Sequence, residues 1–180
     1  MERLQEQYTK EIVPKLREKF SHKNIAQVPK LQKIVINVGV GKLNKESKLI
    51  DSIFEDLKKI TGQQPVKTYA RKSISGFKLR EGQLVGLTVT LRGFRMYAFL
   101  DKLINVALPR VRDFRGIAAT GFDGRGSFSL GLREQLVFPE ISADALETPF
   151  GLQITIVSNA GADEPMREIL SAYKFPLKTE

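Results

Sequence analysis

The residues best suited to chemistry in this sequence are the cations between Leu57 and Arg80. That segment, LKKITGQQPVKTYARKSISGFKLR, contains seven Lys or Arg residues and no Asp or Glu. It also holds Gln, Thr and Ser side chains, together with Tyr69 and Phe77. Lys and Arg neutralise phosphates, amides and hydroxyls form hydrogen bonds in grooves, and aromatic rings stack on bases. The composition therefore predicts an RNA-binding segment.

The other reactive side chains do not form a pattern typical of an enzyme. The only histidine, His22, stands between Ser21 and Lys23 and is expected in a solvated loop. The segment IVINVGVGKLNKES resembles a phosphate loop, but Leu43 occupies the place of the required Ser or Thr. Backbone amides at Gly39–Gly41 could bind a phosphate, or these glycines simply form a turn. We expect no catalytic site, no metal site and no cofactor.

Overall charge also favours a polyanionic partner. The chain has 180 residues, a formal net charge of +9 and a pI near 9.8. Residues 134–180 carry −5, so residues 1–133 carry +14. This polarity indicates one face for nucleic acid and another for a different partner, although a basic surface could also serve solubility alone.

Composition and length predict one soluble cytoplasmic domain over residues 1–180. Hydrophobic residues make up 42% of the chain, enough for one substantial core. There is no cysteine, which excludes disulfides and thiolate metal ligands. The charged start, MERLQEQYTKEIVPKL, is unlike a signal peptide, and no apolar run approaches the ~20 residues of a membrane span.

The first half of the chain shows clear periodicities. Apolar residues three or four apart predict a helix over residues 3–20, which Pro14 either kinks or divides. Alternation over residues 33–40 predicts a strand that buries the Ile34 side. A second helix is expected over residues 45–61, with Asn44 as N-cap and Gly62 as its stop.

The second half continues with strands and helices. Strands are predicted at residues 66–70, 84–92, 127–132 and 151–158, and helices at residues 94–108, stopped by Pro109, and around 166–173. Residues 110–125 are expected to form an extended loop. The order predicts an α+β fold, a two-layer sandwich in which a mainly antiparallel sheet of about five strands has helices on one face.

The other face of this sheet is expected to be open and polar. It would gather Lys33, Asn37, Thr88, Thr90, Arg92, Gln153 and Thr155. Thr is a good strand former on any wet face, so the threonines alone do not indicate binding. Asn is disfavoured in strands, which indicates that Asn37 has a partner for its amide.

The segment Arg71–Gly82 is longer than a hairpin between adjacent strands needs. Its cations indicate an anionic partner, and its exposed Ile74 and Phe77 would be a liability without one. The alternative is a basic loop with no target.

A family resemblance adds to this interpretation. The strings LQKIVINVGVG, DLKKITGQQPVKTYARKSISGFKLREG, GLTVTLRG, PRVRDFRG and GFDGRGSFSLGLREQLVFPEI occur in this order. Together they resemble the bacterial form of the 5S-rRNA-binding protein numbered five in the large-subunit series, over essentially the whole chain. The resemblance implies a non-enzymatic, structural role in building the central protuberance with 5S and 23S rRNA and neighbouring large-subunit proteins.

The resemblance also implies site residues. The sheet side would contact 5S rRNA at Asn37, Gln63 and Thr90, with Lys33 and Arg92 alongside. The loop between the second and third strands would reach the elbow of P-site tRNA through Arg71, Lys72, Ser73, Phe77, Lys78 and Arg80. A bridge to a small-subunit head protein would use Arg110, Arg112, Arg115, Glu140 and Asp144.

Two other classes of function remain as alternatives. A nucleotide-hydrolysing enzyme would require measurable nucleotide binding, which the broken phosphate loop argues against. A regulatory RNA chaperone of loose specificity would share the basic charge but would not need a strand asparagine. Competition between 5S rRNA and bulk RNA separates the chaperone from the structural protein.

Overall fold

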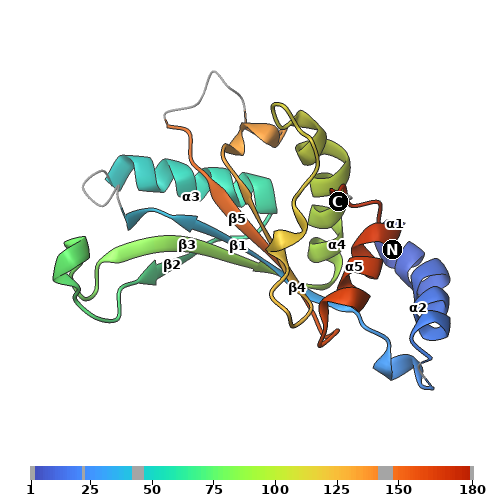
Figure 1. Ribbon diagram of the computed structural model, residues 1–180. Helices are drawn as coiled ribbons and strands as arrows, with labels where there is room; N and C mark the ends of the chain where they lie inside the picture. Colours follow the sequence, from blue (N-terminus) through green and yellow to red (C-terminus); the bar gives the residue numbers. More distant parts are fainter. Residues whose placement is uncertain (1–2, 22, 42–46, 142–147, 179–180) are drawn as a thin grey trace. The chain divides into compact units, whose positions relative to one another are not determined.

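The computed structural model describes residues 3–21, 23–41, 47–141 and 148–178 (Figure 1). The α-helices are α1 (Arg3–Gln7), α2 (Val13–Lys19), α3 (Ser47–Thr61), α4 (Gly93–Lys102) and α5 (Asp163–Ala172). The strands are β1 (Leu31–Gly39), β2 (Val66–Tyr69), β3 (Leu84–Leu91), β4 (Ser127–Leu132) and β5 (Leu152–Ser158). The predicted order of helices and strands is confirmed.

The strands form one five-stranded sheet in the order β2-β3-β1-β5-β4. Strand β2 lies at an edge and pairs antiparallel with β3, with Val66 opposite Thr88 and Thr68 opposite Gly86. Because side chains alternate between faces, Val66, Thr68, Gly86 and Thr88 share one face, and Lys67 and Leu87 share the other. The predicted α+β class with an open sheet is confirmed.

Strand β1 shows why this sheet has one dry and one wet face. Ile34, Ile36 and Val38 are at most 1% exposed, whereas Asn37 and Gly39 between and after them are exposed. The expected alternation is therefore confirmed. In β3, Leu87, Val89 and Leu91 are buried as expected.

Strand β3 departs from strict alternation of burial near its start. Val85 is only half-buried, and Gly86 is buried although it lies on the open face. Gly86 is covered because it has no side chain and its neighbours close over it. A Cβ there would lie 3.0 Å from Thr68 Oγ1 and 3.1 Å from the backbone oxygen of Val38.

Helix α3 lies on the side of the β2–β3 pair to which Lys67 points, although the four residues of β2 itself are exposed. Its inward side chains, including Ile53, Leu57 and Ile60, are almost fully buried. Lys67 of β2 reaches α3, where its Nζ lies 3.5 Å from Asp51 Oδ1 and 5.6 Å from the Phe54 ring centroid. The predicted stop at Gly62 is confirmed, since this residue has a φ of 64° and donates to the Lys58 carbonyl at 2.8 Å. The predicted N-cap, Asn44, lies outside the described residues.

Two helical segments widen into a π-turn shortly before a proline. The π-turn Tyr8–Ile12 precedes Pro14, and the π-turn Leu103–Ala107 precedes Pro109. Proline donates no hydrogen bond and crowds the carbonyl four residues earlier, which a wider turn accommodates. Pro14 thus begins a second α-helical piece, α2. The helical run predicted to stop at Pro109 does end there, since the π-turn finishes at Ala107 and only one closing 3₁₀ turn, Leu108–Arg110, follows.

The described contacts divide the chain into two compact units. One comprises residues 1–34, 91–130 and 155–180, and the other residues 35–90 and 131–154. In the first, Arg3 of α1 pairs with Asp101 of α4 at 2.7 Å, and Lys19 of α2 pairs with Glu168 of α5. The unit boundaries fall within β1, β3, β4 and β5. We retain one domain over residues 1–180 as a proposal.

Candidate nucleic-acid interface

Asn37 and Thr88 meet on the open face of the sheet. Thr88 Oγ1 donates a hydrogen bond to Asn37 Oδ1 at 3.0 Å, which supplies the partner that the sequence predicted for this strand asparagine. Because Asn37 Oδ1 accepts this bond, only its Nδ2 group is left to donate a hydrogen bond. No acceptor for Nδ2 is present among the described residues.

Gln63 is brought to the same strand by the end of α3. Thr61 Oγ1 donates to the backbone oxygens of Leu57 and Gln63 at 2.7 and 3.0 Å, which fixes the turn that follows the helix. Gln63 Nε2 then donates to the Thr90 backbone oxygen at 3.1 Å. The structure therefore brings Gln63 beside Thr90, while Asn37 is bonded to Thr88 two residues earlier on β3.

Thr68 and Gly86 lie beside these polar residues on the open face, although neither was predicted as a site residue. Thr68 Oγ1 donates to the Gly86 backbone oxygen at 2.9 Å. Alternation within VKTY could have placed Thr68 on the open face. Nothing in the sequence indicates that Gly86 must be small. We call Asn37, Gln63, Thr68, Gly86, Thr88 and Thr90 the polar row.

Two cations lie on or next to the strands β1 and β3, which carry members of the polar row. Lys33 is half-buried on β1, and Arg92 is exposed directly after the end of β3. Neither forms an ion pair with any residue that the structure describes. Their charges are consequently available to an external anion.

The segment Arg71–Gly82 is an ordered extension of the β2–β3 hairpin, drawn in green in Figure 1. Ala70 and Gln83 continue the pairing, with the Ala70 amide donating to the Gln83 oxygen at 2.8 Å. Further out, Ile74 and Leu79 exchange two backbone hydrogen bonds of 2.9 and 3.1 Å. Ser73 Oγ accepts from the Glu81 amide at 2.9 Å. These bonds define the shape of the loop.

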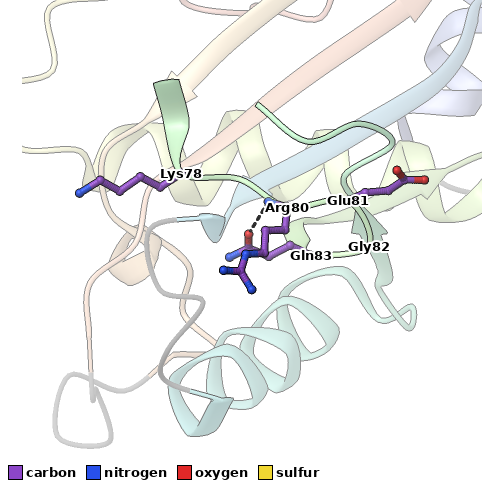
Figure 2. Close-up of a pocket in the computed structure, with 5 residues that line it drawn as sticks. All are labelled: Lys78, Arg80, Glu81, Gly82 and Gln83. Carbon is purple, nitrogen blue, oxygen red and sulfur yellow. Dashed lines mark hydrogen bonds between the residues drawn. The ribbon is translucent and has the colours of Figure 1, made fainter. Parts of the chain in front are cut away.

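The tip of this loop exposes an aromatic ring and cations. Phe77 is 81% exposed in the 3₁₀ turn Ser75–Phe77. Lys78 and Arg80 line a shallow hollow with Glu81, Gly82 and Gln83. Figure 2 shows the Arg80 and Gln83 side chains together and Glu81 pointing away, with the Arg80 amide donating to Gln83 Oε1 at 3.0 Å.

The cations of the basic segment divide into two groups. Lys58, Lys59 and Lys67 form ion pairs with carboxylates of α3. No described residue forms an ion pair with the four loop cations, which are Arg71, Lys72, Lys78 and Arg80. The available positive charge of this segment is therefore concentrated in the loop.

The segment expected as a loop over residues 110–125 is irregular, and Arg110, Arg112 and Arg115 on it are exposed. Its end is held by two carboxylates. Asp163 accepts from the Gly124 and Gly126 amides, each at 3.0 Å, and Asp123 accepts from the amides of Arg125 and Ser127. The amides of Ser127 and Arg125 lower the pKa of the Asp123 carboxyl.

The second segment expected at a bridge lies in the other unit. Glu140 is exposed there, and Asp144 lies outside the described residues. The buried Gln135 side chain donates to the Thr148 oxygen at 3.1 Å and accepts from the Phe150 amide at 2.8 Å. Gln135 thus ties residues 148–150 to the 3₁₀ turn Gln135–Val137, a role that the sequence did not reveal.

The described parts of the chain offer no ligand set for a metal. They contain no group of three or more His, Cys, Asp or Glu residues able to hold a metal ion. No described helix has the length and apolar character to cross a membrane.

Comparisons with known proteins agree with the resemblance found in the sequence. The family model for ribosomal protein L5 matches residues 24–80, and the model for the C-terminus of the same ribosomal family matches residues 84–177. A large ribosomal subunit protein uL5 from Brevibacillus brevis is 56% identical over 176 residues, covering 98% of each chain. The uL5 protein of Syntrophomonas wolfei is 54% identical over 178 residues, covering 99% of this chain and all of the relative.

Proposed function

The chain belongs to the ribosomal protein L5 family, and from this premise we propose that it binds 5S rRNA with the open face of its sheet to help form the central protuberance. As a member of this family it is a structural, non-enzymatic protein of the large ribosomal subunit in the cytoplasm, in contact with rRNA and other ribosomal proteins. The role of each surface is part of the proposal.

The polar row is the observation that carries the proposal. The wide, shallow minor groove of A-form RNA presents 2′-hydroxyls and base edges, which short polar side chains on a flat surface can reach. The row consists of Thr, Asn and Gln side chains around Gly86. Thr90 Oγ1 and Asn37 Nδ2 have no partner among the described residues, so both groups are available to RNA.

Phosphate contacts are assigned to Lys33 and Arg92. Both side chains reach solvent on strands that carry members of the polar row, and neither is neutralised within the described chain. Contacts with phosphates position a protein on RNA, whereas contacts with groove atoms select the sequence or shape. The two cations therefore contribute affinity, and Asn37, Gln63 and Thr90 contribute specificity.

The Arg71–Gly82 loop is proposed to contact the elbow of P-site tRNA. Its four cations, which have no ion-pair partner in the described chain, offer phosphate contacts, and the Ser73 hydroxyl and exposed Phe77 ring offer hydrogen-bond and stacking contacts. The backbone hydrogen bonds within the loop support this assignment, because a preformed contact surface loses less conformational entropy on binding.

A bridge to a small-subunit head protein is proposed for the two remaining segments. Arg110, Arg112 and Arg115 would contribute positive charge, and Glu140 with Asp144 negative charge. Contacts with 23S rRNA and with other proteins of the central protuberance complete the proposed set of partners.

Equilibrium titration with 5S rRNA tests the central assignment. Asn37→Ala or Thr90→Ala should each cost about 1–3 kcal/mol of binding free energy, because a group in the groove loses its hydrogen bond. Asn105→Ala is the matched control, since it removes an exposed amide whose hydrogen bonds to described residues are both to Asp101 on α4. Wild-type affinity in both test variants, with folding intact, would refute the role of the polar row.

A further inference from the structure

Phe94 is a large apolar side chain that is exposed to solvent. It is 62% exposed, and the run of residues 92–95 is exposed throughout. Met96 and Tyr97, which follow in the same helix, are 2% and 7% exposed, so the inner side of α4 is filled without Phe94. An exposed aromatic ring beside a filled core indicates a contact outside the chain.

The backbone at Phe94 lies between two regular elements, β3 and α4. Arg92 is extended, with φ −137° and ψ 161°, and Gly93 has a φ of 54°. That left-handed conformation favours glycine and turns the chain from β3 into α4. Phe94 then lies in the first turn of α4, a helix of ten residues. Its position is therefore defined before any partner binds.

The charges around Phe94 identify the chemistry of the partner. Arg92 precedes the ring by two residues and is exposed, and the first turn of α4 contains no acidic residue. A purely apolar partner would not match this guanidinium group, and an acidic partner alone would not need the ring. An unpaired nucleotide matches both, because its base stacks on an aromatic ring and its phosphate attracts arginine.

We propose that Phe94 stacks on an unpaired base of 5S rRNA, with Arg92 beside an adjoining phosphate. This inference rests on the proposed function, which assigns Thr90 to 5S rRNA. Phe94 follows Thr90 by four residues, so their Cα atoms are at most about 14 Å apart whatever the conformation between them. An RNA that contacts Thr90 is within reach of Phe94.

Titration of the full chain with 5S rRNA tests the stacking contact. Phe94→Ala should weaken binding about 5- to 150-fold, the range observed when stacking aromatic residues are replaced by alanine. The slope of log K against log salt should not change, since no phosphate contact is lost. Phe94→Tyr should retain affinity within about threefold, because it keeps the stacking ring.

Ile25→Ala is the matched control, because it removes an apolar side chain that is 64% exposed and to which no contact is assigned. It should bind 5S rRNA like wild type, with thermal unfolding of both alanine variants unchanged. An equal loss in Ile25→Ala and Phe94→Ala would overturn the proposal, because the effect would then not be specific to Phe94.

A spectroscopic test is available because the chain contains no tryptophan. Phe94→Trp introduces a single tryptophan, whose emission should be quenched when a base stacks on it, whereas Ile25→Trp should not respond to 5S rRNA. The stacking proposal would be overturned if Phe94→Ala bound 5S rRNA with wild-type affinity and Phe94→Trp showed no quenching. If Asn37→Ala still weakened binding in the same assay, the proposed function would stand. Absence of 5S binding by the wild-type chain would overturn the proposed function as well.

Discussion

Gly86→Ala should damage both the sheet and its open face. The added Cβ would lie 3.0 Å from Thr68 Oγ1, 3.1 Å from the Val38 backbone oxygen and 3.6 Å from Asn37 Oδ1. Thr68 can rotate away, but it then loses its hydrogen bond to the Gly86 oxygen. The Val38 oxygen belongs to β1, which has neighbouring strands on both sides and cannot easily move. Crowding of a backbone atom is therefore unavoidable.

The size of this effect follows from opposing contributions. The lost hydrogen bond costs about 0.5–1.5 kcal/mol, and overpacking typically costs about 1–3 kcal/mol. Replacing Gly by Ala returns about 0.4–1 kcal/mol by restricting the unfolded chain. Because the two costs overlap when Thr68 rotates, we expect a net destabilisation of about 1 kcal/mol. That corresponds to a fall of about 2–4 °C in Tm for a protein of this size.

Binding should suffer separately from stability. The added methyl group would protrude beside Asn37 from the flat surface that is proposed to contact the shallow RNA groove. We therefore expect the affinity for 5S rRNA to fall about tenfold, which is equivalent to the loss of one groove hydrogen bond. Gly39→Ala is the control for stability, because its Cβ would meet nothing within 4 Å. Urea denaturation and 5S titration measure the two effects. Equal stability of the two variants would refute the crowding argument, and wild-type affinity of Gly86→Ala would remove this residue from the interface.

Three further predictions address other parts of the molecule. Shortening the loop 71–82 should leave binary 5S affinity within about 1 kcal/mol of wild type while tRNA leaves the P site faster; a larger loss of 5S affinity would show that the loop binds 5S rRNA instead. Lys33→Gln or Arg92→Gln should lower the slope of log K against log salt by about one unit and leave the preference for 5S rRNA over bulk RNA unchanged. An altered preference at constant slope would contradict the assignment of affinity to the cations and of specificity to the polar row. Burial raises the pKa of Tyr8 to about 12 and raises that of Tyr173 further above 10. Above pH 10 the unfolded chain releases these protons and the folded chain keeps them, so urea denaturation should show stability falling from about pH 10 upward, with a weaker fall in Tyr173→Phe.

Much of the fold could be predicted because its signals are local. The alternation around Ile36 and the stop at Gly62 each depend on a few consecutive residues and on fixed backbone periods. The π-turns before Pro14 and Pro109 could not be predicted in the same way. A proline removes one hydrogen bond, but packing decides whether the helix ends, kinks or widens.

The candidate site could be predicted only in part, because some of its features depend on tertiary packing and not on local sequence. Asn37 drew attention because Asn is unusual in a strand, and the loop cations because they form a run without acids. Nothing in the sequence distinguished Lys67, which is neutralised on α3, from Arg80, which has no ion-pair partner among the described residues. Ion pairs depend on which face of a strand meets a helix, and charge counts do not contain that information.

The sequence by itself determined the element types, the two faces of β1 and the position of the basic loop, because each follows from neighbours within a few residues. Only the tertiary structure decided the polar row. Thr88 and Asn37 are 51 residues apart, and Gln63 and Thr90 are 27 apart. They meet because β3 lies between β2 and β1 in the sheet. Strand order is set by the packing of the whole core, and hydrogen bonds between strands follow from it.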